Sequence, residues 1–345
     1  MGLILPLKYK KSGAAAIALQ EFEPGDTFTP DWIDTFTCRN KFINGTLNFF
    51  QRGVNFSVSG TGAGYYSDRW LFNYAAVNLQ VVRLSLNVGE IDQLINCMRV
   101  VVSGYGSGTS GVNMRQPIEL VHTLNGKDAV VSFWARAGAT GQTITVRGQQ
   151  VFGTGGSANV GLNGGGTVNL STSWERYAVK ISVPSALGKT YGANNNLQII
   201  FDFNGNGTYD IAGFDCSEGS VLLPFEYPSF ADEIPRVQRY YEKSYDLGIT
   251  PGSASAFGRC GEFLATTRSG ATAWLVKFAT RKRSASTIAI YASETGAVNN
   301  VSQDNGTNVA LNGISSVGET GFQISYTNSA GRYGASFHFT ADSEF

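Results

Sequence analysis

The stretch VLLPFEYPSFADEIPRVQRYYEKSYD, which spans Val221–Asp246, divides this chain of 345 residues into two parts. Its prolines and aromatic residues give way to helical spacing, with Ser229 or Asp232 as the N-cap and Pro235 in the first turn. A helix of about three turns is unstable alone in water, so its apolar stripe must pack on a domain or on a neighbouring chain. That stripe contains Ile234, Val237, Tyr240 and Tyr241.

On both sides of this segment, the sequence alternates between apolar and polar residues and is interrupted by glycine-rich clusters. Glycine accounts for 42 residues, and only 15% of the chain is charged. The run DAVVSFWARA places Val131, Phe133 and Ala135 on one face of a strand, with Ser132 and Trp134 on the other. This pattern is typical of antiparallel β-structure with many tight turns.

The sequence therefore predicts an all-β protein made of two antiparallel β-sandwiches joined by one short helix. The first sandwich is expected to be of the jelly-roll type, and an N-terminal arm precedes it. The predicted segments are the arm at residues 1–42, the jelly roll at 43–223, the linker helix at 224–245 and the C-terminal sandwich at 246–345.

Charge and hydropathy argue against several classes of partner. The net charge is +0, and no segment carries the basic excess that binding to a phosphate backbone requires. No run approaches the roughly 20 apolar residues of a membrane-spanning helix. The cysteines lack the spacing of a metal site, so we expect them to be buried or half-buried free thiols. We therefore expect neither nucleic-acid binding nor membrane insertion.

Three stretches carry a resemblance to a known family. The junction SEGSVLLPFEYPSFADEIPRVQRYYEKSY resembles the segment that joins two domains in many tailed-phage fibre proteins. The run VKFATRKRSASTIAIYAS is similar to a strand pair of that family, with Lys282 in place of methionine and Ser286 in place of proline. The ending FHFTADSEF is similar to the family's C-terminus, with Phe339 in place of tryptophan. The matching junction residues are Gly219, Ser220, Pro224, Phe225, Glu226, Glu233, Gln238, Arg239, Tyr240 and Tyr241.

Upstream of the junction, GYYSDRW, VVSFWARA and TSWERYAVKISVP resemble a carbohydrate-binding-module-like jelly roll. Near the start of the chain, LQEFEPGDT is similar to the N-terminal attachment segments of phage structural proteins. The resemblance implies a virion protein that is made in the host cytoplasm, attaches through its arm to other virion proteins and forms a homotrimer. It also implies that residues 234, 237, 240 and 241 lie at the trimer interface.

The implied function is receptor binding by a tail fibre or other external appendage, with bacterial surface polysaccharide as the partner and no enzymatic activity. Display in many copies would give avidity to weak single sites. Two alternatives remain open at this point. One is a structural decoration or head-fibre protein without receptor binding, and the other is a glycan depolymerase.

The run DFNGNGTYD resembles a calcium loop, with Asp202, Asn204, Asn206 and Asp210 as candidate ligands. The position that should hold a bidentate glutamate is Gly213. We therefore favour a β-hairpin whose Asn-Gly pairs form the turn, with a structural Ca²⁺ as the alternative. No other cofactor is expected.

Aromatic residues are the candidate glycan contacts, because aromatic faces suit the apolar face of a sugar ring. We expect exposed contacts at Tyr65, Tyr66 and Tyr105. The strand patterns around Trp70, Trp134 and Trp174 favour packing between the sheets. Asp68 and Arg69 are expected to form a structural ion pair, and His338 is expected at the surface or at a trimer interface rather than in a catalytic site.

Overall fold

The computed structural model describes residues 7–10, 18–21, 39–106, 108 and 110–345. Contacts divide the chain into two compact units, Met1–Arg39 and Asn40–Phe345. The division falls after Arg39 rather than after residue 42, and Phe42 is buried in the core of the larger unit. Most of the predicted attachment arm lies outside the described residues. In the smaller unit, β1 (Leu7–Lys10) pairs antiparallel with β2 (Ala18–Glu21).

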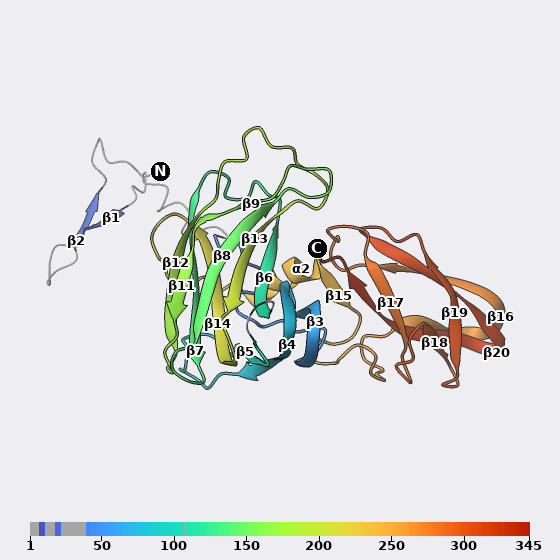
Figure 1. Cartoon of the computed structure of the whole chain (residues 1–345). Coiled ribbons are helices and arrows are strands. Elements are labelled where there is room, and N and C mark those ends of the chain that lie inside the picture. Colours follow the sequence, from blue (N-terminus) through green and yellow to red (C-terminus); the bar gives the residue numbers. More distant parts are fainter. Residues whose placement is uncertain (1–6, 11–17, 22–38, 107, 109) are drawn as a thin grey trace. The chain divides into compact units, whose positions relative to one another are not determined.

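The larger unit begins with a jelly-roll-like sandwich, and its hydrogen-bonded order is β10-β12-β7-β14-β5-β4-β6-β13-β8-β11. In addition, β3 pairs with β4 and β9 pairs with β8 (Figure 1). The strands are β3 (Asn55–Ser67), β4 (Trp70–Ser85), β5 (Asn96–Ser103), β6 (Gly111–Glu119), β7 (Asp128–Ala137), β8 (Thr143–Val151), β9 (Val160–Gly161), β10 (Asn163–Gly164), β11 (Gly166–Asn169), β12 (Glu175–Ser182), β13 (Asn196–Phe203) and β14 (Gly207–Glu218).

The long strand β4 connects the two layers of this sandwich. Residues 71–75 pair with β6, whereas residues 78–85 pair with β5. Ala76 lies between these two stretches with a φ of 51°, which turns the strand from one layer into the other. Because β3 accompanies β4 through the bend, the β3–β4 hairpin belongs to both layers.

Alternating side chains enclose the core between the layers, as the sequence predicts. Val131, Phe133 and Ala135 are fully buried in it. The ring of Phe133 lies 5.3 Å from that of Phe201 at 87°, an edge-to-face arrangement that aromatic pairs favour. Trp70 is 0% exposed and packs 4.5 Å from Phe214. The pattern of the sequence thus correctly identifies the inward face of these strands.

The predicted helix is present as α2 (Phe230–Gln238). The side chain of Ser229 caps it by accepting a hydrogen bond from the backbone N–H of Asp232. The helix is shorter than its apolar stripe predicts, because Tyr241 already belongs to β15 (Tyr241–Lys243). The buried carboxylate of Glu233 fixes the helix on the jelly roll by accepting hydrogen bonds from the backbone N–H of Asn44 and the hydroxyl of Thr46, both at 2.9 Å.

A second sandwich follows and has its own core, which includes Phe322, Phe337 and Phe339. Its central strand β20 pairs with β15, β16, β17, β18 and β19, so one strand holds the whole sandwich together. The remaining strands are β16 (Cys260–Lys277), β17 (Thr287–Ala292), β18 (Asn300–Gln303), β19 (Asn308–Ser315) and β20 (Gly321–Asp342). The predicted all-β fold of two sandwiches and one short helix is confirmed. No helix among the described residues has the length and apolar character needed to cross a bilayer.

The C-terminal residues return to the junction between the sandwiches, and Figure 1 shows this end of the chain beside α2. Residues 241–243 pair with 340–342. The backbone N–H of Ser343 donates to the carbonyl of Tyr240 at 2.7 Å. The guanidinium of Arg283 lies 4.1 Å from the ring centre of Phe345. The junction stretch and the C-terminal ending, far apart in sequence, therefore form one structural element.

Candidate functional site

The predicted glycan contacts Tyr65 and Tyr66 do not form an exposed aromatic platform. Tyr66 is 9% exposed, and its ring packs 4.9 Å from Phe56 and 5.7 Å from Phe72. Tyr65 is half-buried, with the guanidinium of Arg52 5.3 Å from its ring centre. The prediction of an exposed contact is therefore wrong for Tyr66, which is a core residue.

The four candidate calcium ligands do not converge. Their strands belong to different layers, because β13 pairs with β6 and β8 whereas β14 pairs with β5 and β7. The predicted β-hairpin is wrong for the same reason: residues 204–206 cross between layers. Each candidate ligand is instead bonded to a different partner. Asp202 pairs with Arg147, and Asp210 accepts hydrogen bonds from Arg99 and Arg136. Asn204 donates to the hydroxyls of Thr143 and Thr145, and Asn206 bonds the backbone of Tyr105. No group of three or more His, Cys, Asp or Glu side chains suited to a metal is found in the described part of the chain.

The predicted trimer-interface residues are mostly covered within one chain. Val237 is 0% exposed, Tyr240 3% and Tyr241 5%, and Ile234 is half-buried. An interface between chains cannot use side chains that the same chain already buries. This role is therefore wrong for Val237, Tyr240 and Tyr241, while the trimer itself stays a prediction.

The two tyrosines instead stack under arginines of the jelly roll. The guanidinium of Arg69 lies 3.4 Å from the ring centre of Tyr240, and that of Arg52 lies 3.7 Å from Tyr241. Arg69 also pairs with the buried Glu344. Such cation–π contacts in a desolvated setting are worth about 2 kcal/mol each. The helix stripe thus joins the two sandwiches of one chain.

The expected ion pair between Asp68 and Arg69 is also wrong, because each has another partner. Asp68 pairs with Arg52 at 2.9 Å, and Arg69 pairs with Glu344. These two residues form the tip of the β3–β4 hairpin, where Ser67 faces Trp70. A tight hairpin directs the two side chains to different partners, which adjacency in the sequence does not reveal.

His338 is buried rather than exposed at a surface. It is 0% exposed and stacks on Tyr245 at 3.7 Å. Its Nε2 lies 2.9 Å from the carbonyl oxygen of Ser255, so Nε2 carries the proton, and Nδ1 lies 2.9 Å from the hydroxyl of Ser244. Both ring nitrogens are engaged, which leaves no free group for catalysis.

Two of the three tryptophans lie outside the core that holds Trp70. Trp134 and Trp174 are half-buried on the outer face of the layer that contains β7. The indole N–H of Trp174 donates to Glu90 at 2.8 Å, and the guanidinium of Arg136 lies 4.8 Å from the Trp174 ring. Packing between the sheets is therefore correct for Trp70 only.

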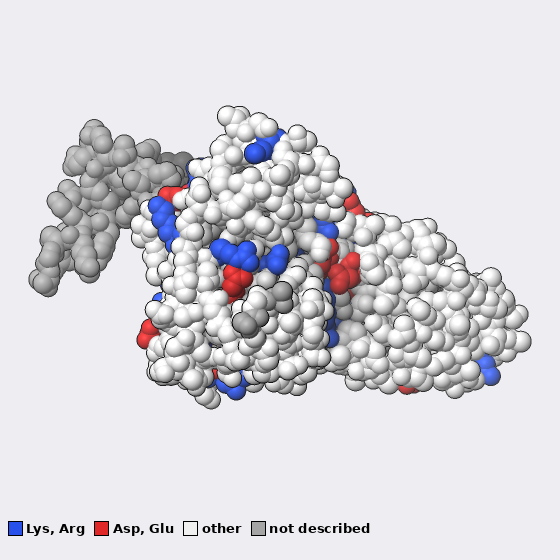
Figure 2. Space-filling model, in the orientation of Figure 1, with Lys and Arg blue, Asp and Glu red and all other residues white. Residues whose placement is uncertain are grey.

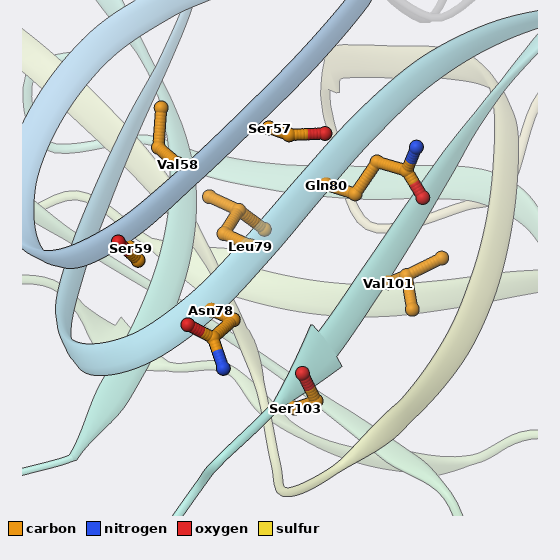
Figure 3. Close-up of a pocket in the computed structure, with 8 residues that line it drawn as sticks. All are labelled: Ser57, Val58, Ser59, Asn78, Leu79, Gln80, Val101 and Ser103. Carbon is orange, nitrogen blue, oxygen red and sulfur yellow. The ribbon is translucent and has the colours of Figure 1, made fainter.

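The described surface has a polar groove on the outer face of β3, β4 and β5, with a volume of about 440 Å³ (Figure 3). Of its apolar lining residues, Val101 faces the groove, whereas Val58 and Leu79 point to the opposite face and pack in or against the core. Hydroxyl and amide groups surround Val101. Figure 3 shows Ser57 beside Gln80 and Asn78 beside Ser103, in agreement with the strand register. The polar lining residues are Ser57, Ser59, Asn78, Gln80 and Ser103.

Most of these polar groups are free to bind a ligand. The hydroxyls of Ser57, Ser59 and Ser103 and the amide of Asn78 have no hydrogen-bond partner within the described residues. All four side chains are exposed. The groove thus offers uncommitted donors and acceptors around the side chain of Val101.

A second hollow of about 410 Å³ lies at the neighbouring edge, between residues 138–142 and residues 204–208. Asn204 and Asn206 hold its rim through the bonds described above, and Tyr105 is attached to this rim by its backbone. Gly207 is required here, since a Cβ would meet the Nε2 of Gln142 at 1.4 Å. The lining residues are Gly138, Ala139, Thr140, Gly141, Gln142, Asn204, Asn206, Gly207 and Thr208.

The two hollows adjoin, because Val101 of the first pairs with Thr208 of the second. We call their combined lining the neutral strip. None of its residues is ionisable. From β3 to β7 it crosses four strand spacings, which corresponds to roughly 19 Å. That length suits an extended, uncharged and hydroxyl-rich ligand.

Ion pairs border the neutral strip on the same face. Arg99 and Arg136 both pair with Asp210, and Arg136 also pairs with Glu90 at 2.8 Å. Burial raises the pKa of Asp210, but hydrogen bonds from the two arginines outweigh it, so the pKa lies below its usual value. These charges neutralise one another and add no uncommitted charge beside the strip.

The opposite layer carries a network of arginines and amides on β6, β13 and β8. Arg115 donates to Asn113 at 2.8 Å and to Gln198 at 3.2 Å, and Gln149 donates to Gln198 at 3.0 Å. Figure 2 shows a small group of charged atoms over this part of a face that is otherwise mostly uncharged. The side chains of this network already bond one another, unlike those of Ser57, Ser59, Asn78 and Ser103 in the first hollow.

The sequence does not predict the neutral strip, apart from Tyr105 and the two asparagines at its edge. Short alternating runs such as NFSVSG do place small polar residues on the outward face of a strand. A hydroxyl on an outward face is common, however, and only the structure reveals which ones lack partners and line a hollow.

No family model matches this chain, and no curated protein matches it. The enzymatically active domain of tailspike protein 4 from bacteriophage CBA120 is similar to it with a TM-score of 0.34 and 16% identity, covering 52% of this chain and 22% of that one. A family 11 carbohydrate-binding module from Clostridium thermocellum has a TM-score of 0.30 and 12% identity, covering 48% of this chain and 96% of the module. The xylan-binding module CBM22-1 of Paenibacillus barcinonensis Xyn10C has a TM-score of 0.29 and 11% identity, covering 50% and 93%. TM-scores below 0.5 at these identities do not establish a shared function.

Proposed function

We propose that this chain binds a glycan of the bacterial surface through the neutral strip and does not cleave it. The observation that carries this proposal is a pair of adjoining hollows without an ionisable lining residue, the first of which exposes uncommitted hydroxyl and amide groups. Sugar hydroxyls need donors and acceptors of this kind, and Val101 among them offers an apolar contact to a sugar ring. Glycoside hydrolysis needs two carboxyl groups, and the strip contains none.

The setting that we propose is the exterior of a tailed-phage virion, as a tail fibre or another appendage. The resemblance of the junction and of the C-terminal ending to fibre proteins supports this location. Avidity would raise the strength of weak sites if three chains are displayed together. Because the helix stripe is buried, the proposed homotrimer would use other surfaces. Light scattering on the purified full-length chain tests this, and a monomeric mass at all concentrations would contradict it.

Binding of the labelled full-length chain to host cells tests the glycan proposal. Ser103→Arg places a long charged side chain in the first hollow, and Asn169→Arg places the same residue at another exposed strand position. We expect Ser103→Arg to reduce adsorption by about tenfold or more and Asn169→Arg to leave it unchanged. Periodate oxidation of the cell surface should abolish adsorption of the wild type. Equal adsorption by both variants, or adsorption that survives oxidation, would contradict the proposal.

An assay of sugar release separates binding from cleavage. The full-length chain is incubated with purified host polysaccharide, and new reducing ends are measured. We expect none above the level of a buffer control. Release that depends on the protein would support a depolymerase instead.

A further inference from the structure

A third cavity, of about 290 Å³, lies where α2, β6 and the start of the larger unit meet. Figure 2 shows basic and acidic atoms gathered near α2. This junction pocket shares no residue with the neutral strip. Its lining consists of Lys41, Ile43, Arg69, Gln116, Ile118, Glu119, Arg236, Arg239 and Tyr240.

Two of the four cations are neutralised by carboxylates. Arg239 binds Glu119 through two hydrogen bonds, at 2.7 and 2.9 Å, and Arg69 pairs with Glu344. Burial raises the pKa of Glu119, but hydrogen bonds from Arg239 and Tyr240 and the charges of Arg239 and Arg69 outweigh it, so the pKa is lowered and Glu119 stays ionised. These pairs therefore contribute no net charge to the pocket.

The other two cations, Lys41 and Arg236, pair with no carboxylate within the described residues. Both are half-buried. The guanidinium of Arg236 donates a long hydrogen bond to the carbonyl of Phe42, at 3.5 Å. Burial raises the pKa of the nearby Glu233 carboxyl, and the charge of Arg236 acts in the opposite direction. With Glu233 included as a carboxylate, four cations against three carboxylates leave a net positive charge in a concave, partly desolvated site, where electrostatic attraction is stronger than in open water.

The backbone next to these cations is held in place. The side chain of Gln116 accepts a hydrogen bond from the N–H of Ile43 at 2.7 Å and donates to its carbonyl at 2.8 Å. This paired contact fixes the segment that carries Lys41 against β6. Arg236 is fixed independently by α2, whose position depends on Glu233. The two cations are thus attached to separate, ordered elements that face one cavity.

We propose that the junction pocket binds a single anionic oxygen group, either a phosphate or a carboxylate. Arg236 would supply paired N–H donors and Lys41 a point charge, the two ways in which proteins hold such groups. The group could be free phosphate or an acidic substituent of a surface polysaccharide. This proposal does not depend on the neutral strip, and Ser103→Arg should leave it unaffected.

Thermal unfolding of the full-length chain in increasing inorganic phosphate tests the pocket, with sodium chloride at matched ionic strength as the reference. A ligand that binds the native state raises Tm with its concentration. We expect phosphate to raise Tm more than sodium chloride does, and Lys41→Gln/Arg236→Gln to lower the affinity for phosphate about tenfold or more. The control Lys189→Gln/Lys277→Gln removes the same charge from exposed positions and should keep the response. An equal response to both salts, or a response that survives in the first variant, would overturn the proposal.

A measurement on the wild type avoids dependence on the folding of the variant. In ¹⁵N spectra of arginine side chains, the Nε–H signal of Arg236 should shift on addition of phosphate, and an unshifted signal at saturating phosphate would overturn the proposal. The source of the anion follows from a comparison of inorganic phosphate with acidic and neutral oligosaccharides of equal length. If the acidic oligosaccharide binds at least about tenfold more tightly than phosphate, and Lys41→Gln/Arg236→Gln abolishes this tighter binding, the natural anion is a substituent of a polysaccharide. Equal affinities identify the free ion.

Discussion

Lys282 is a lysine at a position where the resembling fibre proteins have methionine, and its substitution makes a quantitative prediction. Its side chain is 0% exposed and pairs with Glu242, whose side chain is 7% exposed. The ammonium also donates to the carbonyl of Gln238 at 2.6 Å, and it lies 4.7 Å from the ring centre of Phe278. Burial lowers the pKa of Lys282, while the charge of Glu242 and the hydrogen bond to it act in the opposite direction.

Lys282→Met would leave Glu242 buried without its cation and would leave the carbonyl of Gln238 without this donor. Breaking a buried ion pair by removing one partner costs about 3–5 kcal/mol. Because Glu242 keeps a hydrogen bond from the N–H of Ala279 at 3.0 Å, we expect a loss near the lower end, about 3 kcal/mol.

The double variant Lys282→Met/Glu242→Gln removes both charges and keeps the side-chain oxygen that accepts from Ala279. Replacing a whole buried pair with neutral groups of similar volume is often close to neutral, so its stability should lie within about 1 kcal/mol of the wild type. Glu242→Gln alone leaves the ammonium without its anion and should be destabilised, so the two changes couple strongly.

Urea denaturation of the four proteins, followed by circular dichroism, measures the free energies of unfolding. Hydrogen exchange of the amides that pair β15 with β20 gives a local measure at the same place, because Glu242 lies in β15. Two results would refute the view that the pair is buried and mutually dependent. One is that Lys282→Met is as stable as the wild type, and the other is that the double variant is no more stable than the single variants.

Three further changes test other parts of the larger unit. Glu233→Ala should cost about 1–3 kcal/mol in urea denaturation, because two donors in the turn at residues 44–46 lose their acceptor, whereas Glu233→Gln should cost less. Burial lowers the pKa of His338 in the folded chain below its ordinary value of 6.5, so at a pH between the folded and the ordinary pKa the unfolded chain binds more protons than the folded one. The free energy of unfolding should therefore fall as the pH drops from 6.5 through this range. His338→Gln should weaken this dependence of stability on pH. Glu344→Gln leaves the fully buried Arg69 without its carboxylate and should lower the stability by about 3 kcal/mol or more, with a smaller change if the contact is exposed in solution.

The regular features of the fold could be predicted from local sequence. Alternation identifies the inward residues of β7, and the N-cap preference identifies Ser229, because both depend on residues only a few positions apart. The β13–β14 connection shows where this reasoning fails. An Asn-Gly turn between two strand-like runs indicates a hairpin, yet each run finds better partners far away in the chain. Strand pairing depends on the whole set of available strands, so a favourable turn does not determine which strands pair.

The burial of the apolar stripe of α2 could also be predicted from the sequence, but the identity of the surface that covers the stripe could not. The spacing of the helix stripe correctly requires a partner, and the sequence alone does not distinguish a second copy from the same chain. In the structure the partner is the β3–β4 hairpin tip, whose Arg52 and Arg69 stack on the two tyrosines. Arg69 lies 171 residues before Tyr240 and Arg52 lies 189 residues before Tyr241, and no local pattern links them.

The residues that carry the resemblance differ from those of the neutral strip in burial and in hydrogen bonding. The junction stretch and the C-terminal ending carry the strongest likeness to fibre proteins, and they pack against each other through β15, β20 and the stacked tyrosines. The residues that make these contacts are buried and bonded to one another, so they hold the two sandwiches together. The neutral strip has the opposite character, since the hydroxyls of Ser57, Ser59 and Ser103 and the amide of Asn78 are exposed and uncommitted within the described residues. Substitutions of these exposed side chains disturb no buried contact, so they could change what the strip binds without changing the fold.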